Sequence, residues 1–103
     1  MSWETLVIGS FTFKEEVDES EQKQVIYELE EVLECTIKWN DKYKIWDFQD
    51  INWSSHVQAE TIKPVVERYS QSFREFDLSL YYLSEADEWI RIDEDGEVVA
   101  NCL

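Results

Sequence analysis

Few residues of this chain have the types and spacing that catalytic chemistry requires. His56 is the only histidine and directly follows Ser54 and Ser55, while Cys35 is a second candidate nucleophile. Neighbours in sequence do not make a catalytic pair, because nucleophile and base must come within hydrogen-bond reach in the fold. We therefore predict no catalytic residues and a protein that is not an enzyme. The opposite reading, an enzyme or small-molecule binder, would need a concave pocket near His56 and Trp53.

A metal or phosphate site also lacks the required spacing. The acidic run Asp93-Glu94-Asp95-Gly96-Glu97 invites comparison with a calcium loop, which needs oxygen ligands at its first, third and fifth positions and glycine at the sixth. Here glycine comes fourth, as expected for an Asp-Gly hairpin turn. One histidine and two cysteines give no zinc spacing, and two glycines in the whole chain cannot build a phosphate loop. We predict no metal and no cofactor.

Charge is distributed very unevenly along the chain. The formal net charge is −15, of which residues 15–34 contribute −8 and residues 85–97 contribute −6, so that the remainder is nearly neutral. A charge so placed repels nucleic acid and anionic membranes, and it attracts cationic protein surfaces. We therefore expect no nucleic-acid partner, no membrane partner, and a basic protein as the partner.

The first acidic stretch has helical periodicity. Asp18 and Glu21 have capping-box spacing, and apolar residues then recur at helical intervals over residues 19–34. With Leu29 at the centre of the buried stripe, Tyr27 falls on the outward, acidic side. A tyrosine can anchor an interface while carboxylates steer a basic partner toward it. The predicted partner-binding residues are Tyr27, Glu28, Glu31, Glu34, Asp93, Glu94 and Asp95; the alternative is two solvated faces that keep the protein soluble.

Two helices separate the predicted strands. Alternation predicts strands over residues 5–14, 35–39, 43–48, 76–82, 89–92 and 98–100, and a second helix begins near Thr61, with Pro64 in its first turn and Phe73 on its apolar face. This order favours an α+β two-layer sandwich, ferredoxin-like βαββαβ with a C-terminal β-hairpin extension. In that layout the first strand is central and one sheet face has no helix over it.

Aromatic residues give a second hypothesis for an interface. If Tyr43 and Ile45 point toward the helices, the other face of the sheet carries Trp46, Phe48, Tyr81 and Trp89. Such a face is either covered by the chain itself or packs on a second copy, so the alternative function is a self-associating structural or regulatory module, a homodimer.

The chain is predicted to form a single domain, residues 1–103. Its 44% hydrophobic content can fill a core, and residues 1–14 do not have the pattern of a secretory signal. We expect a cytoplasmic protein with reduced cysteines. The leading hypothesis is a non-enzymatic, acidic protein-binding module that acts as an inhibitor, an immunity factor or a nucleic-acid mimic.

Overall fold

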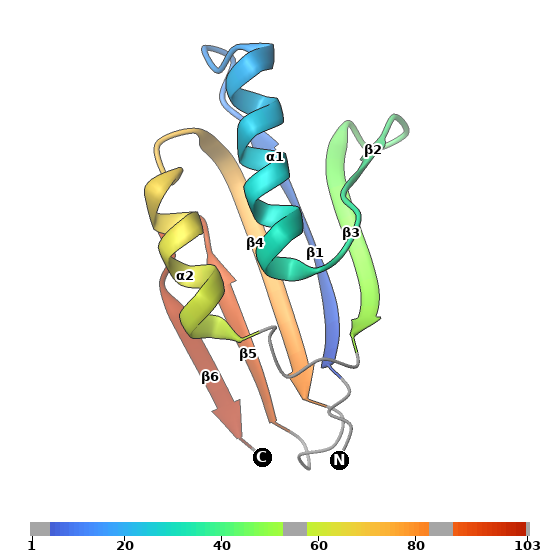
Figure 1. Cartoon of the computed structure of the whole chain (residues 1–103), viewed down its shortest axis with the longest axis vertical. Helices are drawn as coiled ribbons and strands as arrows, with labels where there is room; N and C mark the ends of the chain where they lie inside the picture. Colours follow the sequence, from blue (N-terminus) through green and yellow to red (C-terminus); the bar gives the residue numbers. More distant parts are fainter. Residues whose placement is uncertain (1–4, 53–57, 83–87, 103) are drawn as a thin grey trace.

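The computed structural model describes residues 5–52, 58–82 and 88–102, and within them the fold is α+β. Two helices lie against one face of an antiparallel sheet of six strands (Figure 1). The elements in chain order are β1 (Thr5–Phe13), α1 (Glu19–Leu33), β2 (Lys38–Asn40), β3 (Ile45–Asn52), α2 (Ala59–Arg68), β4 (Phe73–Tyr82), β5 (Glu88–Asp93) and β6 (Val98–Cys102).

The sheet order is β2-β3-β1-β4-β5-β6. The first strand is central, as predicted: Gly9 of β1 lies opposite Phe48 of β3 on one side and Leu78 of β4 on the other. Every pair of neighbouring strands is antiparallel. The sheet therefore has two edges, the β2–β3 hairpin and β6.

Helix α1 confirms the predicted cap and buried stripe. The Asp18 carboxylate accepts the Glu21 backbone N–H at 2.8 Å, which satisfies one of the backbone donors left over at a helix start. Val25, Leu29 and Leu33 are fully buried, whereas Tyr27 and Glu31 on the opposite side of the helix are exposed. The helix ends where Glu34 takes a left-handed conformation with φ 50°.

The second helix differs from the prediction. It starts at Ala59, so Pro64 is its sixth residue and not part of the first turn. Pro64 leaves the Glu60 carbonyl without its helical partner, which is tolerable because Glu60 is exposed to water. Phe73 is not helical: it begins β4 and packs between Phe13 and Phe76.

The β2–β3 hairpin is also shifted relative to the prediction. Cys35 and Ile37 are buried but lie before β2, whose three residues pair only with the start of β3. The Glu30 carboxylate accepts the Ile37 backbone N–H at 2.9 Å and thereby holds this connection against α1. Buried and exposed residues can alternate in an irregular segment as they do in a strand. The alternation over residues 35–37 therefore led us to predict a strand where the chain is irregular.

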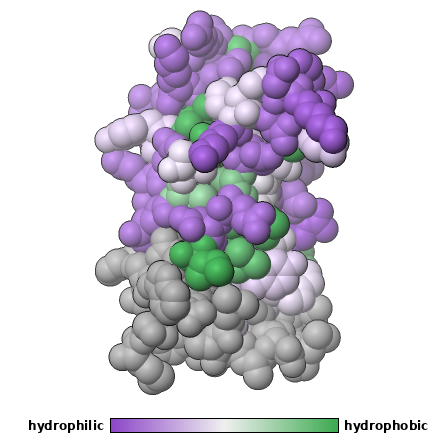
Figure 2. Space-filling model, turned by 90° about the vertical axis from the view of Figure 1, so that its right-hand side faces the viewer, coloured by the Kyte–Doolittle hydropathy of each residue, from purple (hydrophilic) through white to green (hydrophobic). Residues whose placement is uncertain are grey.

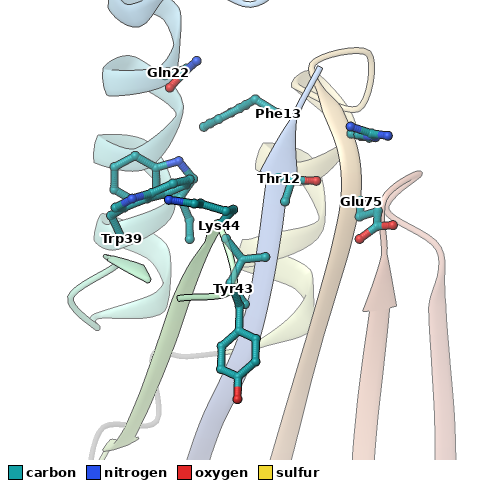
Figure 3. A pocket seen from close by; sticks show the side chains of 10 residues that line it. Thr12, Phe13, Gln22, Trp39, Tyr43, Lys44 and Glu75 are labelled. Carbon is teal, nitrogen blue, oxygen red and sulfur yellow. The ribbon is translucent and has the colours of Figure 1, made fainter. Parts of the chain in front are cut away.

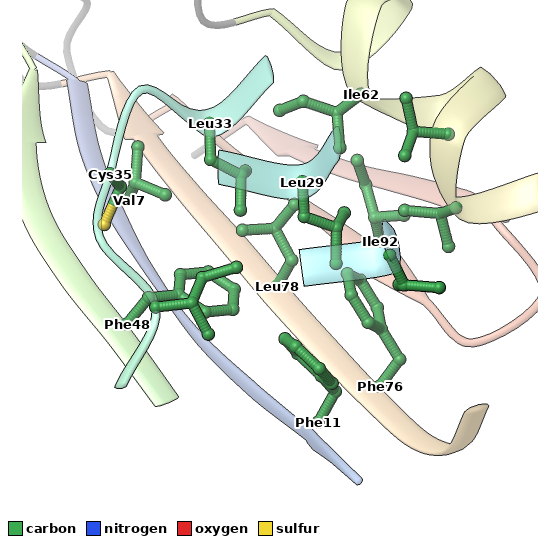
Figure 4. Packing of buried hydrophobic residues seen from close by; sticks show 14 of the residues in the cluster. Val7, Phe11, Leu29, Leu33, Cys35, Phe48, Ile62, Phe76, Leu78 and Ile92 are labelled. Carbon is green, nitrogen blue, oxygen red and sulfur yellow. The ribbon is translucent and has the colours of Figure 1, made fainter. Parts of the chain in front are cut away.

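The core fills the space between the sheet and the helices (Figure 4). Phe11 is its aromatic centre, in contact with Phe13, Phe48, Phe73 and Phe76 at ring separations of 5.4–6.3 Å. Aliphatic residues from β4, β5 and both helices complete it: Val25, Leu29, Leu33, Ile62, Val66, Leu78, Leu80 and Ile92. This core fixes which face of β1, β3, β4 and β5 is turned away from the helices.

Candidate partner-binding surface

Tyr27 lies on the outward side of α1, with 59% of its surface exposed. A hydrogen bond to the Glu31 carboxylate raises the pKa of Tyr27 above its ordinary value, because the carboxylate favours the protonated phenol. Glu31 is exposed as well. The pair combines an aromatic ring and a charge that a partner could contact together.

Glu28, predicted for the same surface, lies instead in the junction between the helices. Arg68 of α2 donates to one of its carboxylate oxygens at 2.5 Å, and the Tyr69 hydroxyl donates to the other. The side chain of Glu28 is only 18% exposed. These contacts give Glu28 a structural role that its helical spacing did not predict.

Glu34 lies at the opposite end of the helix from its acidic first turn. Its backbone N–H donates to the Glu30 carbonyl at 2.9 Å, and the residue is exposed. Glu34 therefore belongs to the C-terminal end of α1, about two turns beyond Tyr27.

The acidic turn between β5 and β6 is held by its own first residue. One Asp93 carboxylate oxygen accepts the backbone N–H groups of Asp95 and Glu97 at 3.0 and 2.9 Å. Gly96 has φ +80°, which glycine adopts readily. Asp93 thus shapes the turn, while the adjacent Glu94 and Asp95 are exposed.

Helix α2 links the two acidic segments. Its C-terminal Arg68 bonds to Glu28 of α1, whereas Lys63 donates to the Gly96 carbonyl of the β5–β6 turn at 2.9 Å. Lys63 also lies 3.4 Å from Glu67 on its own helix. The two acidic segments therefore flank α2, and its basic side chains are engaged with them.

The structure corrects the predicted facing of two aromatic residues. Phe48 is 4% exposed and part of the core, and Trp46, on the same side of β3, packs partly against that core. The physical reason is Gly9, opposite Phe48: with no side chain on β1, the Phe48 ring can lie over that strand. Trp46 and Phe48 therefore cannot form an interface on the face without helices.

Tyr81 and Trp89 do lie on the face without helices, with ring centroids 6.3 Å apart. The register places Leu6 beside Tyr81 and Ile51 beside Leu6, so one apolar row crosses this face. Ile51 is 47% exposed. The prediction missed Ile51 because its strand was expected to end at Phe48, whereas β3 continues to Asn52.

Seen from the side on which β2 and β3 lie, the surface is mostly hydrophilic, with one small hydrophobic area in its lower half (Figure 2). At the upper end of this side is a pocket of about 370 Å³ between the β2–β3 hairpin and the end of β1 (Figure 3). Trp39, Tyr43 and Lys44 line it from the hairpin, with Thr12 and Glu75 opposite.

Two cations of that hairpin have contacts within the hairpin itself. Lys44 bonds to Asp41 at 2.8 Å, and Lys42 lies 5.2 Å from the centre of the Tyr43 ring. The pocket is open and its lining is mixed in charge. His56 and Trp53, around which a pocket was predicted as the mark of an enzyme, lie outside the described residues.

Cys35 is buried, and its pKa is raised to about 11. Burial is the main cause, and the nearby negative charge of Asp50 adds to it, while the Gln49 backbone N–H acts in the opposite direction. A thiol with this pKa is almost fully protonated at neutral pH and is a poor nucleophile.

No family model, curated protein or solved structure matches this chain. Within residues 5–52, 58–82 and 88–102, no group of three or more histidine, cysteine or acidic side chains is arranged to hold a metal ion. No helix in the same part of the chain is long and apolar enough to cross a membrane.

Proposed function

We propose that this protein is a non-enzymatic binding module whose acidic surface engages a basic protein. The observation that carries the proposal is the exposure of Tyr27 beside Glu31 on a helix whose opposite side is fully buried. Aromatic residues surrounded by carboxylates supply contact area and steering together. The buried, protonated Cys35 supports the non-enzymatic part of the proposal.

Not every acid of the two segments contributes equally in this proposal. Glu28 and Asp93 are engaged within the fold, so we assign them to its stability. Tyr27, Glu31, Glu94 and Asp95 are exposed and form the proposed contact set, with Glu34 at the end of the same helix. The expected location is the cytoplasm, where a basic partner would meet this surface.

We also propose that the sheet follows the ferredoxin-like order, extended by the β5–β6 hairpin. The neighbour order β2-β3-β1-β4, with β3 and β1 in the middle, supports this assignment. The placement of both helices over one face supports it too (Figure 1). Cross-strand amide NOEs between β1 and both of its neighbours would test the order in solution.

The functional proposal is tested by isolating a partner at low salt and measuring its affinity with purified components. We expect the affinity to fall as ionic strength rises, because screening weakens attraction between exposed charges. Tyr27→Ala and Glu31→Gln should each weaken binding, whereas Gln49→Ala, an exposed change on the other face of the sheet, should not.

Poly-lysine serves as the comparison ligand. It reports attraction to negative charge alone, so Tyr27→Ala should leave its binding unchanged while lowering the affinity of the specific partner. Equal loss for both ligands, or an affinity indifferent to salt, would contradict the proposal.

A further inference from the structure

Strand β6 forms one edge of the sheet, where charged residues would protect it from pairing with another strand. Its five residues, Val98 to Cys102, include no charged residue, although 32% of the chain is charged. Val99 is 56% exposed and Val98 is 39% exposed. Exposed edge strands present unpaired N–H and C=O groups that can pair with another strand, and charge is a common device against such pairing.

The opposite edge of the sheet is protected. Strand β2 pairs with β3 from Ile45 to Asp47, and the Asp50 carboxylate accepts the Ile51 backbone N–H at 2.8 Å. The surface on that side is mostly hydrophilic (Figure 2). Among the described residues, β6 has neither a covering strand nor a charged side chain, so the two edges are built differently.

The turn geometry identifies which backbone groups of β6 point outward. The Asp93 N–H donates to the Glu97 carbonyl, so the backbone groups of this pair, which directly precedes the Ile92–Val98 pair of the ladder, face each other. Hydrogen-bonded and non-hydrogen-bonded pairs alternate in an antiparallel ladder. Val99 therefore bonds inward to β5, and the backbone groups of Val98, Ala100 and Cys102 point away from it.

We propose that β6 pairs antiparallel with β6 of a second copy of this chain, with Ala100 opposite Ala100 of the second copy. In this register Val98 lies opposite Cys102 of the second copy, so the outward residues form three consecutive hydrogen-bonded pairs. A two-fold axis through Ala100 makes the interface self-complementary, as closed dimers require. The two sheets join into one continuous sheet.

The arrangement of charge allows a second copy to pair in the antiparallel orientation and opposes the parallel one. Antiparallel pairing places the two acidic turns at opposite ends of the new ladder, about 20 Å apart at roughly 3.4 Å per residue. That separation exceeds the Debye length of about 8 Å at physiological salt, so the repulsion between the turns is screened. Parallel pairing would put the turns about 5 Å apart and is disfavoured.

This inference is independent of the proposed function, and the two proposals predict opposite effects of salt concentration on binding. Binding of a basic partner should weaken as salt rises, whereas dimerisation of two chains of charge −15 should strengthen. Sedimentation velocity on the whole chain, from about 1 µM to about 1 mM, should show a monomer–dimer equilibrium whose Kd falls with added salt.

Two substitutions locate the interface. Ala100→Pro removes an outward N–H and no bond to β5, and it should raise the dimer Kd at least about tenfold with an unchanged circular dichroism spectrum. In a Cys102→Ser background, Ala100→Cys should form a covalent dimer on mild oxidation, because directly paired residues lie about 5.5 Å apart. Val99→Cys is the matched control: it is exposed, but across the axis its two copies lie more than about 7 Å apart, beyond disulfide reach.

A strict monomer over the whole concentration range would overturn the proposal, and the edge would then be open to a strand of another protein. A dimer that survives Ala100→Pro, or that crosslinks equally well through residue 99, would also overturn it by placing the interface elsewhere. Crosslinking through residue 100 alone remains informative if the proline variant fails to fold.

Discussion

The Phe48 ring occupies the space into which a side chain at Gly9 would project. A Cβ added to Gly9 would lie 2.7 Å from Cζ of Phe48 and 2.3 Å from the Asp77 carbonyl oxygen. Carbon atoms do not approach so closely, so residue 9 of the central strand must be glycine for the ring and β4 to keep their places. This contact determines which face of β3 carries its aromatic residues.

Gly9→Ala should therefore destabilise the fold by about 2–3 kcal/mol, near the upper end of what overpacking a core costs. Part of the clash is with backbone, so shrinking the ring with Phe48→Leu in the same chain should restore only a fraction of the loss. Urea unfolding of the single and double variants measures both effects. Ser10→Ala, on the other face of the same strand, is the control and should change stability by less than about 0.5 kcal/mol.

Glu28→Gln should lower stability more than Glu31→Gln does. Glu28 accepts from Arg68 and Tyr69, and an amide can accept through only one of its two terminal atoms. Since Arg68 is 60% exposed, solvent weakens the ion pair, and we expect a loss of about 1–2 kcal/mol. Glu31 is exposed and its substitution should be nearly neutral. Thermal unfolding of the two variants measures both losses. Equal losses would contradict the assignment of Glu28 to the stability of the fold and of Glu31 to partner contact.

Helical periodicity predicted the bounds and the buried side of α1 closely, because both depend on residues that are near one another in the sequence. Asp18 caps the backbone three residues on, and the apolar stripe needs only helical spacing. The second helix was placed less well, because Phe73 continues the same period after the helix has ended. The helix ends at Arg68, and just before β4 the Lys14 N–H donates to the Ser72 carbonyl at 3.0 Å, a contact between distant parts of the chain that helical spacing cannot reveal.

The sequence predicted which residues belong to the candidate surface, but it did not predict which of them are exposed for a partner and which stabilise the fold. Spacing placed Tyr27 outside, as found, yet it could not separate Glu28 from Glu31, because their difference depends on Arg68, 40 residues away. The facing of Trp46 and Phe48 was predicted wrongly for a related reason. A strand with apolar residues on both faces leaves its orientation open, and only its neighbour Gly9 resolves it.

Cys35 should react slowly with thiol reagents until the protein unfolds. With a pKa of about 11, roughly one thiol in a thousand is ionised at pH 8, compared with about one in four for an ordinary cysteine. Labelling kinetics in a Cys102→Ser background, with and without denaturant, measure the difference. A native labelling rate within tenfold of the denatured rate would contradict both the burial and the pKa.

The same thiol should make stability depend on alkaline pH. The pKa is higher in the folded state than in the unfolded state, so the unfolded chain loses its proton first as pH rises above about 8.5. The contribution of Cys35 is fully present below about pH 8 and falls by about 2–3 kcal/mol as pH reaches 11. Cys35→Ala removes this part of the slope, so the stability difference between wild type and variant should shrink over that range. A constant difference would show that Cys35 does not titrate as described.

Asp93 should tolerate loss of its charge but not loss of its oxygen. One carboxylate oxygen accepts two backbone N–H groups that close the β5–β6 turn, and asparagine keeps an acceptor at the same place. Asp93→Asn should therefore leave stability unchanged or raise it slightly, because Glu94 and Asp95 lie next to it with like charge. Asp93→Ala leaves both N–H groups to solvent and should lower the free energy of unfolding by about 1 kcal/mol or somewhat more.

Chemical denaturation of the two variants at low and high salt separates the effect of the charge from that of the hydrogen bonds. Added salt should reduce any gain in stability of the asparagine variant and leave the loss of the alanine variant nearly unchanged. An asparagine variant as unstable as the alanine variant would mean that the charge, and not the hydrogen bonds, holds the turn.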